Sequence, residues 1–380
     1  MDISLFDVPS LSNDNMTLRD QLSYTGNKWF ELEKALQGES ADLFIKYMEM
    51  TLVCKDDTDP RTFSYWDQLG MKKELHPGKH KRNHWVSFVP KAAYDPENAG
   101  RKWPVVIFTN KIKIIHTEGC GIIQECAKRG YIAAVIAPDN DVDDSEYIAS
   151  FPDLVLQTLP ADPERIYATG FSYGSGRLED LVLNHCPGVF AAYAPTGAHM
   201  MHNEYSVSDV RMELVRKTVM PTIIINGLYE TTQQFPFTRD TYEYHKPSEL
   251  RFFTGVDDKG NIVNTFPKTG PAKVQRLRRR LYMCRCRDVN YDQCLAAADS
   301  CDPVCRVFAA PFDKTYTQNI YGVKCFLGDY IDGEGQWRLR LAGVDAMPHT
   351  ITPPVGVLML DFFDRFKRDM NSGKSIVVKD

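Results

Sequence analysis

A serine flanked by glycines is the feature of this sequence with the clearest chemical potential. Ser172 is the central residue of the run GFSYG at 170–174, which has the form Gly-x-Ser-x-Gly. Glycines at these positions permit a sharp turn in which a strand and a helix approach too closely for a Cβ atom. Such a turn exposes the serine hydroxyl, so the pattern predicts a nucleophile. A glycine- and serine-rich turn without chemistry is the alternative interpretation.

The residues on either side predict the strand and the helix that this turn requires. The run IYA at 166–168 is apolar and favours a short buried strand. Leucine and valine residues between 176 and 183 recur at roughly helical spacing. Ser172 is therefore expected at the N-terminus of a helix, where backbone N–H groups stabilise a developing negative charge.

Short apolar runs alternate with helical patterns over most of the chain. The sequence predicts strands at 85–90, 103–108, 131–137, 166–168, 190–194, 222–226 and 337–341. It predicts helices at 118–129, 146–159 and 355–366. This alternation indicates an α/β fold with a mainly parallel sheet and helices on both faces. The chemistry of such sheets lies beyond the carboxyl ends of the strands, where Ser172 is expected.

Two stretches of the sequence resemble a known family. They are DPERIYATGFSYG at 162–174 and FAAYAP at 190–195. Together with the opening strands at 86–90 and 103–106, they resemble the α/β-hydrolase esterases of the polyhydroxybutyrate depolymerase and feruloyl esterase type. The resemblance covers about residues 84–230 and 335–370. It implies the α/β-hydrolase fold and a serine esterase that needs no metal and no organic cofactor.

The resemblance also implies which residue is the acid of a catalytic triad, because the order in α/β-hydrolases is serine, acid, histidine. Family members usually have His-Gly-x-x-Asp after the strand that corresponds to 222–226, and this sequence has NGLYE at 226–230. Glu230 therefore falls on the acid position. A glutamate also accepts the histidine N–H and stabilises the imidazolium. A surface glutamate is the alternative interpretation, with Asp240 as the reserve acid.

The same resemblance assigns the general base to His349. This histidine ends the loop GVDAMPH at 343–349, which follows the predicted strand 337–341 and precedes the last apolar helix. Strand, loop, histidine and final helix are the layout of the family. His199 and His202, in the loop after the strand at 190–194, are the alternatives for the base, and we expect them to line the pocket instead.

The oxyanion hole is where the sequence departs most from the family. The backbone N–H of Tyr173, next to the nucleophile, is the first expected donor. The second normally comes from a His-Gly loop, but this sequence has Thr109 and Asn110 after the strand that ends at 108. A backbone N–H does not depend on the side chain, so Thr109 or Asn110 is the expected second donor. One lost donor costs about 100- to 1000-fold in rate, so the departure concerns efficiency more than mechanism.

Two parts of the chain lie outside the resemblance. Residues 1–60 are expected to form an N-terminal helical extension, and residues 61–380 the α/β-hydrolase domain. The distance between Glu230 and His349 is generous for one strand–helix pair, so about 254–321 is predicted to be an insertion. Inserted loops at the active-site face often set specificity, which favours a lid or rim subdomain. A stabilising appendage is the alternative.

Cysteines are concentrated in the C-terminal half of the chain. Six of the ten are Cys284, Cys286, Cys294, Cys301, Cys305 and Cys325. Their spacing lacks the paired Cys-x2-Cys knuckles of a typical zinc site, so disulfides, free thiols and zinc ligands all stay open. The other four are interpreted as small core residues: Cys54, Cys120, Cys126 and Cys186.

Charge and hydropathy argue against several classes of partner. A net charge of -5 at pH 7 argues against a nucleic-acid-binding surface, and the basic runs at 72–82 and 276–280 are interpreted as solvated faces. No apolar run approaches the ~18 residues that span a bilayer, so no membrane partner is expected. The N-terminus lacks the basic and apolar regions of a signal peptide, which predicts a cytoplasmic protein unless a signal was removed.

The sequence therefore predicts a serine carboxylesterase that uses Ser172, His349 and Glu230 on small or medium acyl esters. The resemblance implies acetyl or hydroxycinnamoyl esters of plant carbohydrates. A peptidase of the prolyl oligopeptidase type is one alternative, although no propeller-like repeats precede the hydrolase body. The other is a catalytically silent α/β-hydrolase that acts as a binding protein, which Asn226, Glu230 and the missing His-Gly loop favour.

Overall fold

The computed structural model describes most of the chain from residue 39 onward. The described residues are 39–40, 42–44, 46–47, 54, 56–78, 84–109, 114–136, 145–197, 207–228, 266–345, 347 and 350–378. Within the predicted N-terminal extension, the described residues between Glu39 and Tyr47 are helical. The helices expected before residue 39 lie outside the described residues.

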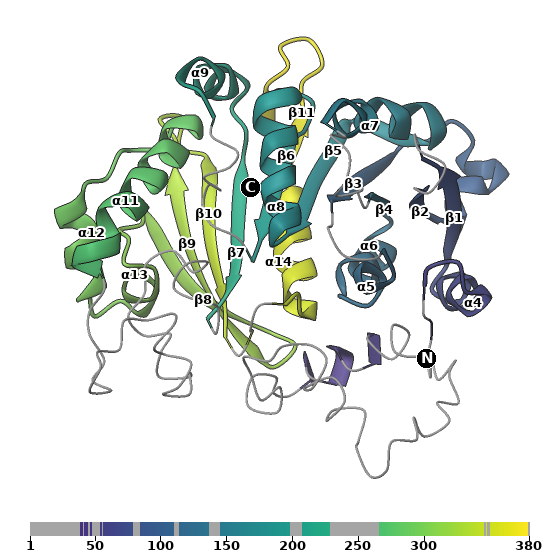
Figure 1. Ribbon diagram of the computed structural model, residues 1–380, viewed down its shortest axis with the longest axis horizontal. Helices are drawn as coiled ribbons and strands as arrows, with labels where there is room; N and C mark the ends of the chain where they lie inside the picture. The colour runs from purple at the N-terminus through teal and green to yellow at the C-terminus, as the bar shows by residue number, and fades with distance from the viewer. Residues whose placement is uncertain are drawn as a thin grey trace.

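A ten-stranded sheet runs through the described part of the molecule (Figure 1). Its spatial order is β1-β2-β4-β3-β5-β6-β7-β10-β9-β8. The strands from β4 to β10 in this order are parallel, whereas β2 at one side and β9 at the other are antiparallel to both of their neighbours. In chain order the strands are β1 (Met71–Pro77), β2 (His84–Pro90), β3 (Trp103–Thr109), β4 (Ile132–Ile136), β5 (Ala161–Phe171), β6 (Ala192–Thr196), β7 (Thr222–Gly227), β8 (Lys314–Ile320), β9 (Val323–Ile331) and β10 (Trp337–Val344).

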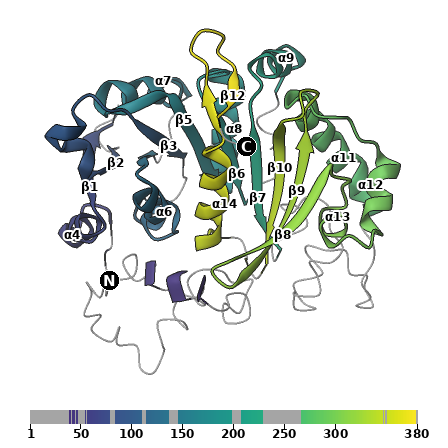
Figure 2. The same ribbon diagram turned by 180° about the vertical axis from the view of Figure 1, so that it is seen from behind.

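Helices cover both faces of this sheet. One face packs against α4 (Pro60–Gln68), α5 (Ile114–Glu118), α6 (Ile122–Arg129) and α14 (Pro353–Phe363). Figure 2 shows α6 and α14 on that side. The other face packs against α7 (Ser145–Thr158), α8 (Tyr173–Glu179), the π-helical segment η3 (Asp180–His185) and α9 (Asp209–Thr218). No helix within the described ranges is both long and apolar enough to cross a membrane.

Apolar sequence runs explain why the central strands lie between two helical layers. All seven residues of β3 are buried, and so are all residues of β4, β6 and β7. Strands of this kind must be covered on both faces, which is the situation of a parallel sheet in α/β proteins. The predicted α/β fold, with a mainly parallel sheet and helices on both faces, is confirmed.

A third apolar cluster lies at the β8 end of the sheet. It joins β7, β9 and β10 to α11 (Phe266–Met283), α12 (Tyr291–Ala298) and α13 (Pro303–Phe308). This part of the chain contains most of the segment that the sequence predicts as an insertion, and residues 254–265 lie outside the described residues. The boundary predicted at 321 falls in the turn between β8 and β9. Two short strands, β11 (Phe366–Arg368) and β12 (Ser375–Val377), follow α14.

All ten cysteines are among the described residues, and none of them forms a disulfide. Cys54, Cys120, Cys126 and Cys186 are buried, as the sequence predicted. Among the described residues, no group of three or more histidine, cysteine, aspartate or glutamate side chains is placed to hold a metal ion.

The structure corrects three expectations, which concern the start of one helix and the exposure of each of the two basic runs. The helix predicted to start at Glu118 starts at Ile122, because Glu118 ends the separate helix α5 and Gly121 turns the chain with φ 93°. The basic runs were interpreted as solvated faces, but Lys73 is 5% exposed and Arg280 is 0% exposed. Each of these two cations has a buried carboxylate partner, which removes the cost of leaving a charge unpaired away from water.

Candidate active site

Ser172 lies at the junction between β5 and α8. Its backbone has φ 53° and ψ −120°, in a region that residues other than glycine rarely adopt. β5 ends at Phe171 and α8 begins at Tyr173, so the serine is the single residue between the strand and the helix. This is the strand–turn–helix context in which a Gly-x-Ser-x-Gly serine is exposed as a nucleophile.

Close backbone contact explains the glycine two residues before the serine. A Cβ atom at Gly170 would lie 2.6 Å from the carbonyl oxygen of Gly174 and 2.7 Å from Oγ1 of Thr109. No side chain fits at these distances. The approach of the first turn of α8 to β5 therefore requires glycine at 170.

Buried hydrogen bonds hold the turn in its strained conformation. The backbone N–H of Ser172 donates to the carbonyl oxygen of Thr196 at 2.9 Å. The hydroxyl of Ser175 donates to the carbonyl oxygen of Gly170 at 2.6 Å and accepts from the N–H of Thr196 at 2.9 Å. The Thr196 hydroxyl also donates to the Gly170 carbonyl, at 2.8 Å. A strained residue persists only when its surroundings fix it in this way.

Thr109 connects the end of β3 to the same turn. It pairs with Gly170 in the sheet, is fully buried, and donates its hydroxyl to the carbonyl oxygen of Gly174 at 2.9 Å. Sequence reasoning considered only the backbone of Thr109, and no local pattern indicated this side-chain contact. Its role as a backbone donor to an oxyanion stays a prediction, and so does that of Tyr173, the first residue of α8.

Several predicted site residues lie outside the described residues. They are Asn110, His199, His202, Glu230, Asp240 and His349. For the two triad candidates, the structure describes residues shortly before each one. Leu228 lies two residues before Glu230, and Met347 lies two residues before His349.

Those two flanking segments pack against each other. β7 and β10 are parallel neighbours in which Gly227 pairs with Val344. The N–H of Leu228 donates to the carbonyl oxygen of Val344 at 2.9 Å. A Cβ atom at Gly227 would lie 1.8 Å from the carbonyl oxygen of Met347. The segments that continue to Glu230 and to His349 therefore leave the sheet side by side.

The strand order places these segments near Ser172. β5, β6, β7 and β10 are consecutive in the sheet, and parallel strands end at one edge. With strands about 4.8 Å apart, β7 and β10 end about 10 and 14 Å along that edge from β5. Two further residues extend by about 7 Å at most.

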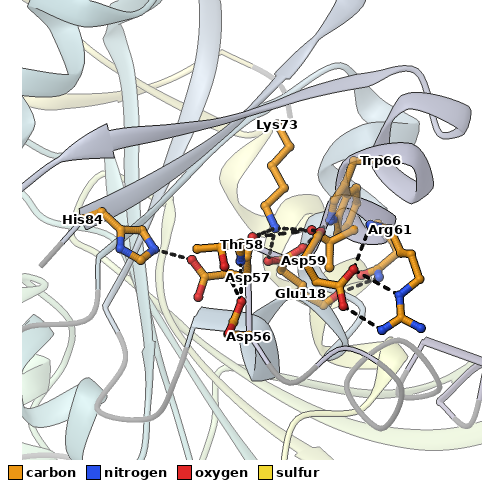
Figure 3. Close-up of polar contacts among 11 residues, drawn as sticks. Asp56, Asp57, Thr58, Asp59, Arg61, Trp66, Lys73, His84 and Glu118 are labelled. Carbon is orange, nitrogen blue, oxygen red and sulfur yellow. Dashed lines mark hydrogen bonds and ion pairs between the residues drawn. The ribbon is translucent and has the colours of Figure 1, made fainter. Parts of the chain in front are cut away.

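A second group of polar side chains lies on the β1 side of the sheet (Figure 3). The ammonium of Lys73 donates to Oε1 of Glu118 at 2.7 Å, to Oγ1 of Thr62 at 2.7 Å and to the carbonyl oxygen of Asp57 at 2.6 Å. Trp66 Nε1 donates to Oε2 of Glu118 at 2.6 Å. Burial raises the pKa of Glu118 to about 7, although Lys73 opposes the shift. The three ammonium donors are all used, so the group ties α4, β1 and α5 together.

Nε2 of His84 and Oδ2 of Asp57 are hydrogen-bonded beside this group (Figure 3). His84 begins β2, which is antiparallel to β4, so it lies at the same edge of the sheet as Ser172. β2 is three positions from β5 in the sheet, or about 14 Å at about 4.8 Å per strand. His84 is thus too far along the edge to take the proton of Ser172.

Comparisons with known proteins give partial overlaps. No family model and no curated protein matches the chain. An acylaminoacyl peptidase from Pyrococcus horikoshii overlaps over 47% of this chain and 36% of its own, with 14% identity and a TM-score of 0.32. An S-formylglutathione hydrolase from Agrobacterium tumefaciens overlaps over 48% and 82%, with 15% identity and a TM-score of 0.32. A ferulic acid esterase overlaps over 42% and 79%, with 14% identity and a TM-score of 0.34.

This chain thus spans about a third of the length of the peptidase. Its own strand order, with a mainly parallel sheet, and the serine turn after β5 stand independently of these overlaps. These two features are those of the fold class that the sequence predicted, an α/β fold with a mainly parallel sheet and a strand–serine–helix turn.

Proposed function

We propose that this protein is a serine carboxylesterase in which Ser172 is the nucleophile. The observation that carries the proposal is the backbone of Ser172, with φ 53° between a central parallel strand and a helix. Such a conformation costs about 1–3 kcal/mol for a residue with a side chain. A turn without chemistry would avoid that cost with glycine, so the retained serine supports a role for its hydroxyl.

His349 and Glu230 complete the proposed triad. The support is the contact between Gly227 and Met347, which joins the two segments that lead to these residues. His349 takes the proton of the Ser172 hydroxyl, and Glu230 accepts the other imidazole N–H and fixes the tautomer. This arrangement gives the serine a base and gives the base an orienting acid.

The reaction proceeds in two halves. The Ser172 oxygen attacks the ester carbonyl, and the N–H groups of Tyr173 and of Thr109 or Asn110 stabilise the oxyanion. The tetrahedral intermediate collapses, and the alcohol leaves with the proton that His349 carries. Water then gives a proton to His349 and attacks the acyl-enzyme. The second tetrahedral intermediate collapses to the carboxylic acid as His349 returns that proton to the Ser172 oxygen. No metal or organic cofactor takes part in these steps.

The proposed substrates are small or medium acyl esters. The sequence resemblance to the feruloyl esterase type supports acetyl or hydroxycinnamoyl groups on a carbohydrate. Methyl ferulate presents the hydroxycinnamoyl group and p-nitrophenyl acetate the acetyl group. Methyl acetate, which shares the methanol leaving group of methyl ferulate, separates the effect of the acyl group from that of the leaving group.

The test compares wild type with Ser172→Ala on these esters, followed by Glu230→Ala and His349→Ala. We expect turnover in the wild type and a loss of at least about 1000-fold in Ser172→Ala, because the acyl-enzyme can no longer form. Retained turnover in Ser172→Ala would overturn the proposal. Wild type that neither hydrolyses esters nor reacts with a fluorophosphonate would favour the binding protein. Hydrolysis of peptide amides that is lost in Ser172→Ala would favour the peptidase.

A further inference from the structure

Helix α11 places a fully buried arginine behind the candidate nucleophile. Arg280 is 0% exposed, and its guanidinium forms an ion pair with Glu179 and donates to the hydroxyl of Tyr193. The two partners are 2% and 1% exposed. Burial lowers the pKa of Arg280 to about 10, which still leaves the side chain charged at neutral pH. The charged guanidinium of Arg280 therefore lies inside the protein with two buried partners.

The two partners belong to the elements that carry and hold Ser172. Glu179 is the last residue of α8, the helix that begins directly after Ser172. Tyr193 lies in β6, the strand whose Thr196 accepts the N–H of Ser172. Arg280 thus joins the far end of the nucleophile helix to the strand that holds its near end. α8 and α11 lie on the same side of the sheet (Figure 1), and Met283 of α11 packs in the cluster that contains Leu178.

Helix α8 needs such support. It has seven residues and passes directly into the π-helical segment η3. A helix of this length is not stable alone, because its nucleation is costly, and π-helical turns are rare and occur mostly as single-turn bulges. Tertiary contacts must therefore hold α8, and the ion pair of Glu179 with Arg280 is a polar one at the junction of α8 and η3.

The choice of an ion pair over apolar packing indicates a geometric role. Replacement of a buried ion pair by apolar side chains of similar volume is often neutral or stabilising, so such a pair is weak support for stability. A guanidinium, however, accepts few orientations when it must reach a carboxylate and a hydroxyl at once, because its donors form a rigid planar fork. The network therefore specifies where the end of α8 lies relative to β6.

We infer that Arg280 is a positioning residue for Ser172, which it holds in place by fixing α8 against β6 through Glu179 and Tyr193. The inference rests on the proposed role of Ser172 as nucleophile. It gives α11, which lies in the segment that the sequence predicts as an insertion, a part in the reaction of this site.

The first experiment compares Arg280→Met with Arg278→Met by amide hydrogen exchange. Arg278 lies on the same helix and pairs with Asp288, but both side chains are more than half exposed, so it is a matched control. We expect the amides of residues 172–183 to exchange at least about tenfold faster in Arg280→Met, with β3 unchanged, and no change in Arg278→Met. Unchanged exchange in α8, or a uniform increase over the whole chain, would overturn the inference.

The second experiment separates position from stability with the double variant Glu179→Met/Arg280→Met. Removal of both charges leaves no unpaired buried ion, so the double variant is expected to regain most of the stability that the single variant loses. We expect kcat on p-nitrophenyl acetate to stay at least about tenfold below wild type while KM changes less than about threefold, because a small displacement of the reacting atom costs up to about 100-fold. A kcat that recovers together with stability would show a structural role only.

Turnover and labelling of the wild type test the proposed function, and kcat of the double variant tests this inference. Wild type without turnover and without fluorophosphonate labelling would make the esterase proposal wrong, and the catalytic part of the inference would fall with it. Normal wild-type turnover with unchanged kcat in the double variant would leave the esterase intact and overturn the role of Arg280 alone.

Discussion

The backbone of Met347 occupies the space that a side chain at Gly227 would need, with its carbonyl oxygen 1.8 Å from the position of such a Cβ atom. Gly227 ends β7, and Met347 follows β10. The loops that lead to the candidate acid and the candidate base are therefore in contact through their backbones. Any side chain at 227 would move one loop relative to the other.

Gly227→Ala is expected to lower both stability and turnover. The added methyl group cannot fit beside a carbonyl group, and overpacking of this kind costs about 1–3 kcal/mol. The free energy of unfolding, measured with urea, should fall by about that amount. Ester turnover should fall at least about tenfold, because the loop that leads to His349 must move.

Gly333→Ala is the matched control for that substitution. No atom lies within 4 Å of a Cβ built at Gly333, so the same methyl group meets open space. We expect its urea midpoint and turnover to equal those of the wild type. Wild-type values in Gly227→Ala as well would contradict the packing of the two loops.

Thr109→Val tests the link between β3 and the serine turn. The substitution keeps the shape but leaves the buried carbonyl of Gly174 without the hydroxyl that donates to it, which costs about 1–3 kcal/mol. We expect a lower melting temperature and slower ester turnover. Thr109→Ser keeps the hydroxyl, and recovery of turnover there would separate the hydrogen bond from packing. Equal melting temperatures for Thr109→Val and wild type would show that this bond does not hold the turn.

Local patterns were sufficient to predict the serine turn and the parallel strands. Gly170 and Ser172 predict a close approach of a strand and a helix. Only a few backbone conformations allow this approach, and the turn adopts one of them. The buried strands are apolar runs such as 103–108, whose composition favours a buried strand over other structures. The start of the helix predicted at 118–129 was harder to predict, because Gly121 interrupts a pattern that is apolar on both sides of it.

The sequence did not predict the burial of two cations, because their partners lie far away in the chain. Lys73 lies on the same face of β1 as the buried Met71, but its partner Glu118 is 45 residues away, and a lysine in a basic run is normally solvated. The same holds for Arg280, whose partners lie in α8 and β6. Local sequence contains no information on which distant carboxylate meets a cation. Glu230 and His349 stay predictions for the site.

The Lys73–Glu118 pair predicts a pH dependence of stability. Burial raises the pKa of Glu118 from 4.5 to about 7, with Lys73 opposing and Asp57 adding to the shift. Between these values the folded state holds a proton that the unfolded chain has released. The contribution of this carboxyl to stability is therefore fully present below pH 4.5 and is lost as pH rises through 7.

Glu118→Gln isolates this effect, because a glutamine does not titrate. We expect the free energy of unfolding of the wild type, minus that of Glu118→Gln, to decrease between pH 4.5 and pH 7.5. Urea denaturation across that range measures the difference. A difference that is constant, or that grows with pH, would contradict the raised pKa of Glu118.

The reactivity of the Ser172 hydroxyl is tested most directly by fluorophosphonate labelling followed by mass spectrometry. We expect one covalent adduct per chain and none in Ser172→Ala. Trypsin places Ser172 and the buried Ser175 on one peptide, residues 166–177, so fragment ions must locate the adduct. An adduct on Ser172 is the result that a serine esterase requires. No adduct on the folded wild type, or an adduct on any other residue, would contradict the proposed nucleophile.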